Sequence, residues 1–415
     1  MNEKLIEALK RWTGTLAGFE AIPREEATGA EQLLMPRKAL FITGIRRSGK
    51  SYLAKMLSKN SAVFINGEDP LIKNATPQEL FESVIHISEQ SKPKLIFVDE
   101  AQNIGDFQAL VRNLLDYFNV PIIVTGSSSA IVTREISSQL SGRYLSLELF
   151  PLSFRDYLHF RGIDEPSLLP EEKLDSYLES FMEYGSFPEV ALNMERANDL
   201  LLSYFSTIVV KDVKERYNVR EGQKLEMFAR ILAENPSTLL SIRRIGRNIG
   251  ISAATAEKFA TYFEEVYFIT LIPKCSPKTY EPIKSMKKAY LSDTGFHALF
   301  YAGRGEKKAR VMENAVAIEL FRRYGRNNIF YHSTPDGYEI DFLVRERNRI
   351  TQLIQVAYEV EDEKAMKREL RALDRAARSF KSANLLVITR SKEGTERLGK
   401  RKIKFVKLWK WLLQG

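Results

Sequence analysis

Residues 44–51 read Gly-Ile-Arg-Arg-Ser-Gly-Lys-Ser, which matches the pattern Gly-x-x-x-x-Gly-Lys-Ser/Thr at every defined position. The apolar run 39–43 precedes this stretch and suits a buried parallel strand, and residues 51–59 follow it with helical spacing. In such a loop the glycines let successive backbone N–H groups turn inward toward a phosphate chain at the start of a helix. The octapeptide therefore predicts a phosphate-binding loop (P-loop) within an α/β fold built on a parallel sheet.

The same loop supplies the expected ligands of the nucleotide, which we expect to be ATP with Mg2+. Lys50 is expected to reach the β and γ phosphates, and the hydroxyl of Ser51 is expected to bind Mg2+. The alternative is an accidental glycine-rich turn, against which the flanking strand and helix argue. The residues expected to hold the nucleotide are Gly44, Ile45, Arg46, Arg47, Ser48, Gly49, Lys50, Ser51 and Asp99.

A second apolar strand ends in two acids, in the sequence Lys-Leu-Ile-Phe-Val-Asp-Glu-Ala-Gln at residues 94–102. We expect Asp99 to hold Mg2+ through water, and Glu100 to be the catalytic group that orients or deprotonates the attacking water. A nucleotide-binding protein that did not hydrolyse would have no need of Glu100. The alternative for Glu100 is a surface acid that caps the following helix.

A third apolar strand, residues 121–129, ends in hydroxyl side chains. In an AAA-type sheet this strand lies between the first two. We therefore expect Thr125 or Ser127 to contact the γ phosphate or the attacking water, and so to sense which nucleotide is bound. The sequence leaves open which hydroxyl does so.

Arg143 precedes a fourth strand and is the first candidate for a catalytic arginine. An arginine at the mouth of a nucleotide site stabilises the charge that builds up on the transferred phosphoryl group. Arg155, Arg46 and Arg47 are the next candidates. The alternative for each is an arginine in a surface salt bridge.

The composition indicates a folded protein with several domains. The chain has 415 residues, of which 44% are hydrophobic, and this predicts two to four domains. There is no apolar run of about eighteen residues and no basic-then-apolar start, so we expect no membrane segment and a cytoplasmic location. The single cysteine, Cys275, excludes internal disulfides, and the four histidines lack metal-ligand spacing, so Mg2+ is the only metal expected.

The positive charge is concentrated near the C-terminus. Residues 300–415 hold 26 Lys and Arg against 15 Asp and Glu, a net of +11, whereas the whole chain carries only +9. A polyanionic partner, most readily DNA or another nucleic acid, is the physical explanation that we favour. The alternative is a solvated charged surface with i,i+4 ion pairs, as in residues 361–380.

Four modules are expected along the chain. Residues 1–150 form the P-loop AAA-type core, and residues 151–220 form a helical lid or connector. Residues 221–295 read as helix, helix, turn, helix and two strands, with Ser252 as an N-cap, which is the pattern of a winged helix. Its expected recognition helix is rich in Glu, so DNA reading and protein packing are both open for this module.

The last module, residues 296–415, follows the order helix, three strands, helix, strand, which is the core order of restriction-endonuclease-like folds. Such nucleases need a carboxylate on one strand and Glu-x-Lys on the next. Asp341 occupies the first position and Glu313 adds a helix carboxylate, but Gln355 and Ala357 stand where Glu and Lys are needed. We therefore expect a degenerate site that does not cut, unless Lys364 or Lys367 reaches it from the following helix.

Taken together, the chain resembles an archaeal and bacterial family of AAA-type ATPases that join a P-loop domain, a winged helix and a C-terminal PD-(D/E)XK nuclease-like domain. The resemblance covers essentially the whole chain and implies ATP-dependent action on or near nucleic acid. Gln355 and Ala357 depart from the family pattern. The motifs that carry the resemblance are GIRRSGKS, IFVDEAQ, VTGSSS, SGRYLSLELFPLSF, YGSFPEV, KDVKERY, YLSDTG, MENAVAIEL and EIDFLV.

We therefore expect an ATPase whose nucleotide cycle changes how the basic C-terminal domain engages DNA or RNA. The first alternative is a signalling switch of the STAND type, in which a protein partner opens a closed, nucleotide-bound form. The second alternative is an ATP-gated nuclease.

Overall fold

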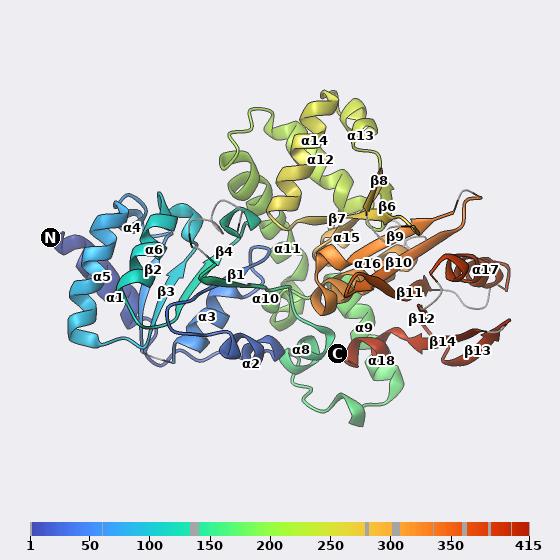
Figure 1. Cartoon of the computed structure of the whole chain (residues 1–415), viewed down its shortest axis with the longest axis horizontal. Helices are drawn as coiled ribbons and strands as arrows, with labels where there is room; N and C mark the ends of the chain where they lie inside the picture. Colours follow the sequence, from blue (N-terminus) through green and yellow to red (C-terminus); the bar gives the residue numbers. More distant parts are fainter. Residues whose placement is uncertain are drawn as a thin grey trace. The chain divides into compact units, whose positions relative to one another are not determined.

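The structure is a computed structural model that describes residues 2–59, 61–132, 140, 142–278, 282–300, 308–334, 336–358, 363–380, 383–399 and 401–414. The chain divides into two compact units. The first unit comprises Met1–Pro151 with Glu265–Tyr267, and the second comprises Leu152–Glu264 with Phe268–Gly415. Each unit has its own sheet, and Figure 1 labels their elements.

The first unit is built on a parallel five-stranded sheet with the order β2-β3-β4-β1-β5. Every residue of β1 to β4 is buried, because these strands are continuous apolar runs covered on both faces, as is usual for parallel sheets. β4 lies between β1 and β3, which confirms the position predicted for the third strand. The strands are β1 (Ala39–Thr43), β2 (Ala62–Asn66), β3 (Leu95–Asp99), β4 (Ile122–Gly126) and β5 (Tyr144–Glu148).

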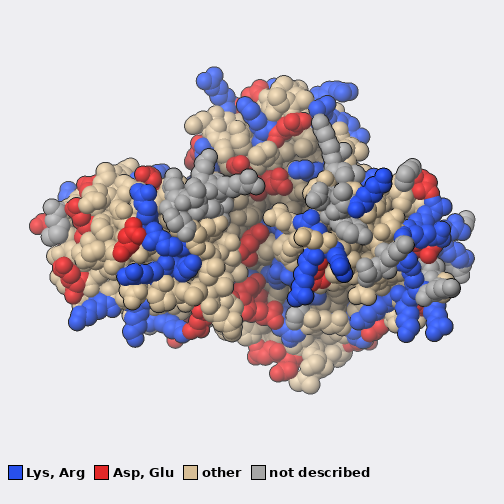
Figure 2. All heavy atoms as spheres, viewed as in Figure 1, with Lys and Arg blue, Asp and Glu red and all other residues tan. Residues whose placement is uncertain are grey.

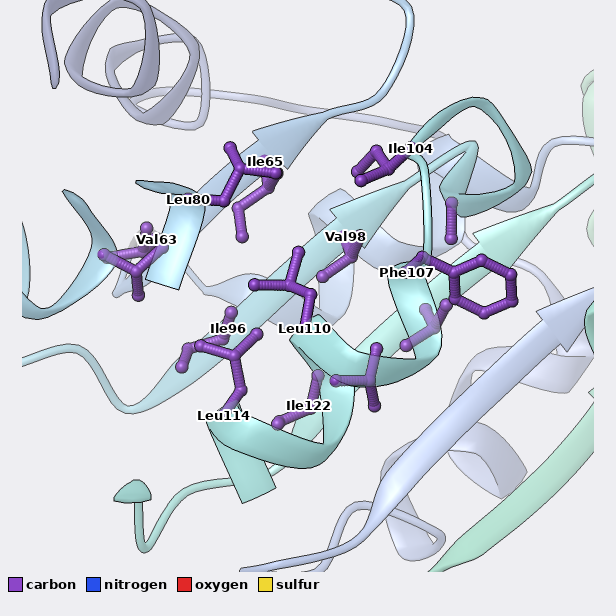
Figure 3. Packing of buried hydrophobic residues seen from close by; sticks show 14 of the residues in the cluster. Val63, Ile65, Leu80, Ile96, Val98, Ile104, Phe107, Leu110, Leu114 and Ile122 are labelled. Atoms are coloured by element: carbon purple, nitrogen blue, oxygen red, sulfur yellow. The ribbon is translucent and has the colours of Figure 1, made fainter. Parts of the chain in front are cut away.

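Alternate residues of these strands contribute to two hydrophobic layers, one on each face of the sheet. On one face, strand residues such as Val63, Ile96 and Ile122 pack against Leu80 of α5 and Leu110 of α6 (Figure 3). The opposite face packs against α3, and there the rings of Phe64 and Phe97 stack at 4.6 Å. The helices and short 3-10 turns of this unit are α1 (Glu3–Gly14), α2 (Glu25–Gln32), α3 (Lys50–Ser58), α4 (Pro70–Lys73), α5 (Pro77–Ser91), η1 (Ala101–Asn103), α6 (Phe107–Tyr117) and η2 (Ser129–Val132).

The second unit is built on a mixed nine-stranded sheet with the order β13-β14-β12-β11-β10-β9-β7-β8-β6. Its two parts are joined where β7 pairs in parallel with β9 at Lys274 and Tyr331. The sequence predicted separate modules here, but the free edge of β7 is covered by β9. The strands are β6 (Thr238–Leu240), β7 (Ile269–Cys275), β8 (Pro282–Leu291), β9 (Ile329–Ser333), β10 (Glu339–Glu346), β11 (Arg349–Ala357), β12 (Asn384–Thr389), β13 (Gly394–Leu398) and β14 (Arg401–Lys407).

Helices surround this second sheet. The long helix predicted over residues 201–217 is present as α11, which continues into a π-helical segment labelled η5. Ser252 accepts a hydrogen bond from the N–H of Thr255 at 3.1 Å, as expected of an N-cap. The elements are α8 (Phe154–Phe160), η3 (Pro166–Leu168), α9 (Glu171–Tyr184), α10 (Pro188–Leu192), η4 (Met194–Arg196), α11 (Ala197–Thr207), η5 (Ile208–Glu215), α12 (Gly222–Glu234), α13 (Ile242–Asn248), α14 (Ala253–Glu265), α15 (Gly295–Phe300), α16 (Lys308–Tyr324), η6 (Arg326–Asn328), α17 (Glu363–Ser379) and α18 (Leu408–Leu413).

A buried carboxylate ties the loop after α9 to the loop after β8. Asp293 accepts hydrogen bonds from the N–H of Ser186 at 2.7 Å and from the N–H of Gly295 at 2.9 Å. Burial raises the pKa of Asp293 to about 7, although these N–H donors oppose the shift. The approach is so close that a Cβ added to Gly185 would lie 1.7 Å from Asp293 Oδ1. The motifs YGSFPEV and YLSDTG therefore meet at this residue.

Candidate functional site

The loop at residues 44–51 lies between β1 and α3, and its glycines are required by its shape. Gly44 has φ 140°, and a Cβ there would lie 2.2 Å from the carbonyl oxygen of Leu149. Gly49 has φ 98° and is the N-cap residue of α3, which begins at Lys50. Only glycine adopts such backbone angles without strain. The loop can therefore run close to Leu149, directly after β5, and lead into the first turn of α3.

The side chains of the loop fit a phosphate chain. Lys50 is only 4% exposed, and its Nζ donates to the carbonyl oxygens of Gly44 at 3.1 Å and Ile45 at 3.0 Å. The hydroxyl of Ser48 is buried and has no hydrogen-bond partner among the residues that the structure describes. A buried ammonium group and an unsatisfied hydroxyl in one loop are donors suited to an anionic ligand.

Arg24 holds this loop from outside the motif, and sequence reasoning missed it. Its guanidinium is buried and donates to the carbonyl oxygen of Ser48 at 2.6 Å and to that of Phe150 at 2.9 Å. These bonds connect the P-loop to the segment that follows β5. No motif surrounds Arg24, and its partner Phe150 is 126 residues away in the sequence. Only the tertiary structure reveals its role.

The two groups expected to bind Mg2+ lie side by side. Ser51 Oγ donates to Asp99 Oδ1 at 2.7 Å, and Thr125 Oγ1 donates to the same oxygen. Burial, together with the charge of Glu100, raises the pKa of Asp99 to about 6. Nowhere in the described chain do three or more His, Cys, Asp or Glu residues gather as a metal site. One hydroxyl and one carboxylate suit Mg2+, which is usually bound by few protein ligands together with phosphates and water.

Glu100 lies directly after β3 and is 8% exposed. Its backbone is left-handed at φ 47°, and its N–H donates to Thr125 Oγ1 at 3.1 Å. Its side chain makes no capping hydrogen bond to η1, which argues against the helix-cap alternative. The carboxylate instead accepts a hydrogen bond from Gln102 Nε2, which also lies 3.4 Å from Ser127 Oγ. The structure thus distinguishes the two hydroxyls, because Thr125 contacts Asp99 and Ser127 contacts Gln102.

The arginine candidates are not gathered at this site. Arg143 lies at the opposite, amino-terminal edge of the parallel sheet, where its carbonyl oxygen accepts from Ala39 N at 3.0 Å. Five-residue strands separate this edge from the P-loop by about 16 Å. Arg143 forms an ion pair with Asp116 at 2.6 Å, so its expected place at the mouth of its own chain's site is wrong. Arg46 lies in the loop and pairs with Glu68 at 3.4 Å.

Arg47 lies within the P-loop, where its backbone is left-handed at φ 70°. Arg155 belongs to the second unit, where it donates to the carbonyl oxygen of Leu413 at 2.5 Å.

A second polar cluster lies in the second unit, around Asp341 on β10. Lys288 Nζ of β8 lies 3.2 Å from Asp341 Oδ1, 2.9 Å from Glu313 Oε1 and 2.6 Å from Glu339 Oε1. Gln355 of β11 is also close, since its Oε1 accepts from the N–H of Asp341 at 3.4 Å. The structure therefore brings together the three residues expected at the degenerate nuclease site, namely Glu313, Asp341 and Gln355.

The lysine that enters this cluster differs from the expected ones. Lys367 is exposed, and the side chain of Lys364 lies outside the described residues. The ammonium comes instead from Lys288, because β8 runs beside β7 in the same sheet and points Lys288 and Tyr290 inward. Burial alone would lower the pKa of Lys288, but the charges of Glu313, Asp341 and Glu339 outweigh it and raise the pKa well above its ordinary value.

Glu369 of α17 completes the cluster by accepting a hydrogen bond from Gln355 Nε2. Burial, and secondly the charge of Asp341, raises the pKa of Glu369 to about 7. Burial raises the pKa of Glu313 to about 7 as well, with the Asp341 charge adding to the shift. One signal for Lys288 is present in the sequence: this residue stands two positions before Tyr290, on the same face of a strand.

Three segments of the chain match models of known families. Residues 36–158 match a family model described as an AAA domain. Residues 175–305 match one described as a domain of unknown function (DUF8612), and residues 308–411 match another, DUF4143. Among the described residues, no helix is both long enough and apolar enough to span a bilayer.

Two relatives with curated sequences are uncharacterized proteins. One, from Methanocaldococcus jannaschii, is 32% identical over 404 residues, which cover 92% of this chain and 89% of the relative. The other, from Haemophilus influenzae, is 27% identical over 336 residues, which cover 77% of this chain and 82% of the relative. Among solved structures, the Saccharomyces cerevisiae Hsp104–ADP complex is 14% identical with a TM-score of 0.34, covering 63% of this chain and 41% of that one.

Proposed function

The chain belongs to the family of AAA-domain proteins that includes the Methanocaldococcus relative, and from this premise we propose that it hydrolyses ATP with Mg2+ and couples the cycle to nucleic-acid binding. The observation that carries the first half is the pairing of Asp99 and Glu100 at the carboxyl end of β3, opposite a P-loop with a buried lysine. A cation-binding acid beside a second acid is the arrangement that nucleotide hydrolysis requires.

In this proposal each residue has a separate task. Lys50 offsets phosphate charge, while Ser51 and Asp99 hold Mg2+, which neutralises charge on the phosphates when bound. Glu100 accepts a proton from the attacking water. Thr125 holds the backbone of Glu100 next to the carboxylate of Asp99 through its two hydrogen bonds. Arg24 positions the loop.

Two variants test the hydrolysis proposal. Lys50→Ala should abolish binding of a fluorescent ATP analogue, because the loop loses its buried cation. Glu100→Gln should bind the analogue normally but hydrolyse ATP at least about a hundredfold more slowly, as expected for the loss of a general base. Normal turnover by Glu100→Gln would remove this residue from the mechanism.

The nucleic-acid half of the proposal rests on two exposed arginines of α17. Figure 2 shows Lys and Arg side chains gathered over the surface of α17 and of the β13–β14 hairpin. Arg368 and Arg371 are exposed, and neither makes an ion pair or hydrogen bond with any described residue. They line a cavity of about 410 Å³ together with Asp336, Gly337 and Tyr338.

A neighbouring arginine, Arg375, contacts two of the residues that line this cavity. Arg375 forms an ion pair with Asp336, and its guanidinium lies 4.4 Å from the centre of the Tyr338 ring. Asp336 is thus already paired with Arg375, which leaves Arg368 and Arg371 as two exposed cations at the same cavity. Such a pair suits the phosphates of a nucleic-acid backbone.

The remaining modules fit this proposal. The order α12, β6, α13, α14, β7, β8 supports a winged helix, in which Arg243 is 78% exposed and lies 3.6 Å from Glu257. The order α16, β9, β10, β11, α17, β12 supports a nuclease-like fold. We propose that this fold binds without cutting, because the ammonium of Lys288 is bonded to the acids that a metal would need.

Binding of labelled single-stranded and duplex DNA by the full chain tests this half. The affinity should fall steeply between about 50 and 200 mM salt, and Arg368→Ala/Arg371→Ala should reduce the log–log salt slope by about two. The matched control is Lys4→Ala/Lys10→Ala, which removes two exposed lysines of α1. No salt-dependent binding by the wild type would contradict the proposal and favour a switch that acts on a protein partner. Cleavage of DNA or RNA in Mg2+ or Mn2+ that is lost in Asp341→Ala would favour the nuclease alternative.

A further inference from the structure

Gln102 connects Glu100 and Ser127 at the edge of the parallel sheet. β3 and β4 are neighbouring parallel strands, so the residues that follow them, Glu100 and Ser127, lie at the same edge of the sheet. Gln102, in the short turn η1, donates from Nε2 to Glu100 Oε2, and the same nitrogen lies 3.4 Å from Ser127 Oγ. A single amide group therefore bridges the expected base and the expected γ-phosphate sensor.

The orientation of this amide is determined by chemistry. The carboxylate of Glu100 only accepts hydrogen bonds, so the NH2 group of Gln102 must face it and the amide oxygen must point away. That oxygen, Oε1, is buried and lacks a hydrogen-bond partner within the described part of the chain. An unsatisfied buried oxygen of this kind destabilises the folded state. The bond to Glu100 is maintained despite this cost.

Gly126 makes room for the amide. A Cβ added to Gly126 would lie 2.5 Å from Gln102 Oε1 and 2.6 Å from Ile131 Cδ1. A side chain at this position would crowd both Gln102 and Ile131, so the amide of Gln102 would have to shift. The final residue of β4 therefore controls the same contact as Gln102 itself.

We propose that Gln102 is a positioning residue that sets the orientation of the Glu100 carboxylate, and that Ser127 is the group through which ATP stabilises this orientation. The inference rests on the proposed ATPase function. Ser127 accepts from Gln102, so its own O–H proton remains available for a γ-phosphate oxygen. A hydroxyl that donates becomes a better acceptor, because hydrogen bonds in a chain polarise one another. The bond from Gln102 Nε2 to Ser127 Oγ then strengthens while its bond to Glu100 Oε2 is kept, so the carboxylate is held where it accepts a proton from the attacking water.

The central test is Gln102→Leu, which keeps the volume of the side chain but removes its hydrogen bonds. The kcat for ATP should fall at least about tenfold, since a misplaced base loses part of the hundredfold or greater effect of general base catalysis. The KM for ATP and the Kd values for ATP and ADP analogues should stay within about threefold, because the hydrogen bonds of Gln102 to described residues go to Glu100 and Ser127 and not to the P-loop. The matched control is Gln78→Leu, which removes an exposed glutamine that donates to Glu82 at 2.7 Å.

Two further variants separate positioning from simple structural support. Gly126→Ala should lower kcat as well, and the double variant Gly126→Ala/Gln102→Leu should be no slower than Gln102→Leu, because both changes break the same contact. Ser127→Ala should weaken the Kd of the ATP analogue about fivefold relative to that of ADP, which corresponds to one hydrogen bond. This binding measurement does not depend on turnover.

The outcomes are distinguishable from failure of the proposed function. If the wild type hydrolyses ATP and Glu100→Gln does not, but Gln102→Leu turns over like Gln78→Leu, this inference alone is wrong. Equal weakening of ATP and ADP binding in Gln102→Leu would show a structural role and would also overturn it. Absence of hydrolysis by the wild type would instead contradict the ATPase proposal itself.

Discussion

Replacing Lys288 with methionine should destabilise the second unit strongly. The ammonium is the cation shared by Glu313, Glu339 and Asp341, at distances between 2.6 and 3.2 Å, and the side chain is only 4% exposed. Methionine preserves the apolar stem, so the change removes charge without opening a large cavity. Removing one partner of a buried ionic group typically costs about 3–5 kcal/mol of unfolding free energy.

The loss should depend on pH with a definite sign. Without the ammonium, the remaining carboxyl groups must be neutralised by protons, so their pKa values in the folded variant rise above those in the unfolded chain. A group with a raised pKa contributes stability at low pH that is lost as the pH rises through that pKa. The deficit of Lys288→Met relative to the wild type should therefore be smaller at pH 5 than at pH 8.

Urea unfolding followed by tryptophan fluorescence provides the measurement. A Trp12→Phe background removes the tryptophan of the first unit, so that Trp409 and Trp411 of α18 report on the unit that holds Lys288. The triple variant Lys288→Met/Glu313→Gln/Asp341→Asn should recover most of the lost stability. Lys258→Met, at an exposed lysine of α14, is the control and should change stability by less than about 0.5 kcal/mol. A Lys288→Met protein as stable as this control would refute the reasoning.

Three further predictions concern other parts of the chain. Arg143→Ala should leave the Kd for an ATP analogue unchanged within about twofold and cost less than about 1 kcal/mol, since Arg143 forms a surface ion pair away from its own P-loop; a large loss of binding in a fluorescence titration would contradict this placement. Gly185→Ala should destabilise the protein by more than Gly162→Ala in thermal unfolding, because both glycines have positive φ but only Gly185 would bring its Cβ against Asp293. Asp293, with a folded pKa of about 7, should contribute a decrease in stability of no more than about 4 kcal/mol as the pH rises from 4 to 7, and Asp293→Asn should remove this component of the pH dependence in urea unfolding.

The nucleotide site could be predicted in large part because its residues are local in sequence. The P-loop is one octapeptide between a strand and a helix, and Asp99 with Glu100 ends a single apolar run. The position of β4 between β1 and β3 followed from the expected AAA-type sheet. The choice between Thr125 and Ser127 could not be made, because it depends on which side chains meet at the sheet edge.

Residues that act across long sequence separations were missed. Arg24 reaches Phe150, and Lys288 reaches Asp341 across 53 residues. Strand periodicity indicates that Lys288 and Tyr290 share a face, but not what that face contacts. The sequence left open whether Lys364 or Lys367 reaches the cluster, and Lys288 was not considered, because local helix spacing cannot show that a strand from another module lies close.

The pairing of β7 with β9 affects how the chain can be divided. If residues 300–415 were separated from the rest, β9 would expose an unpaired edge, and edges of this kind recruit other strands. The isolated piece would also lack Lys288 and keep a buried group of carboxylates with no cation. We expect such a fragment to aggregate or unfold. A gene fusion that transferred the basic C-terminal module to another protein would have to include β7 and β8. The segment that folds as a unit is therefore larger than the sequence motifs suggest.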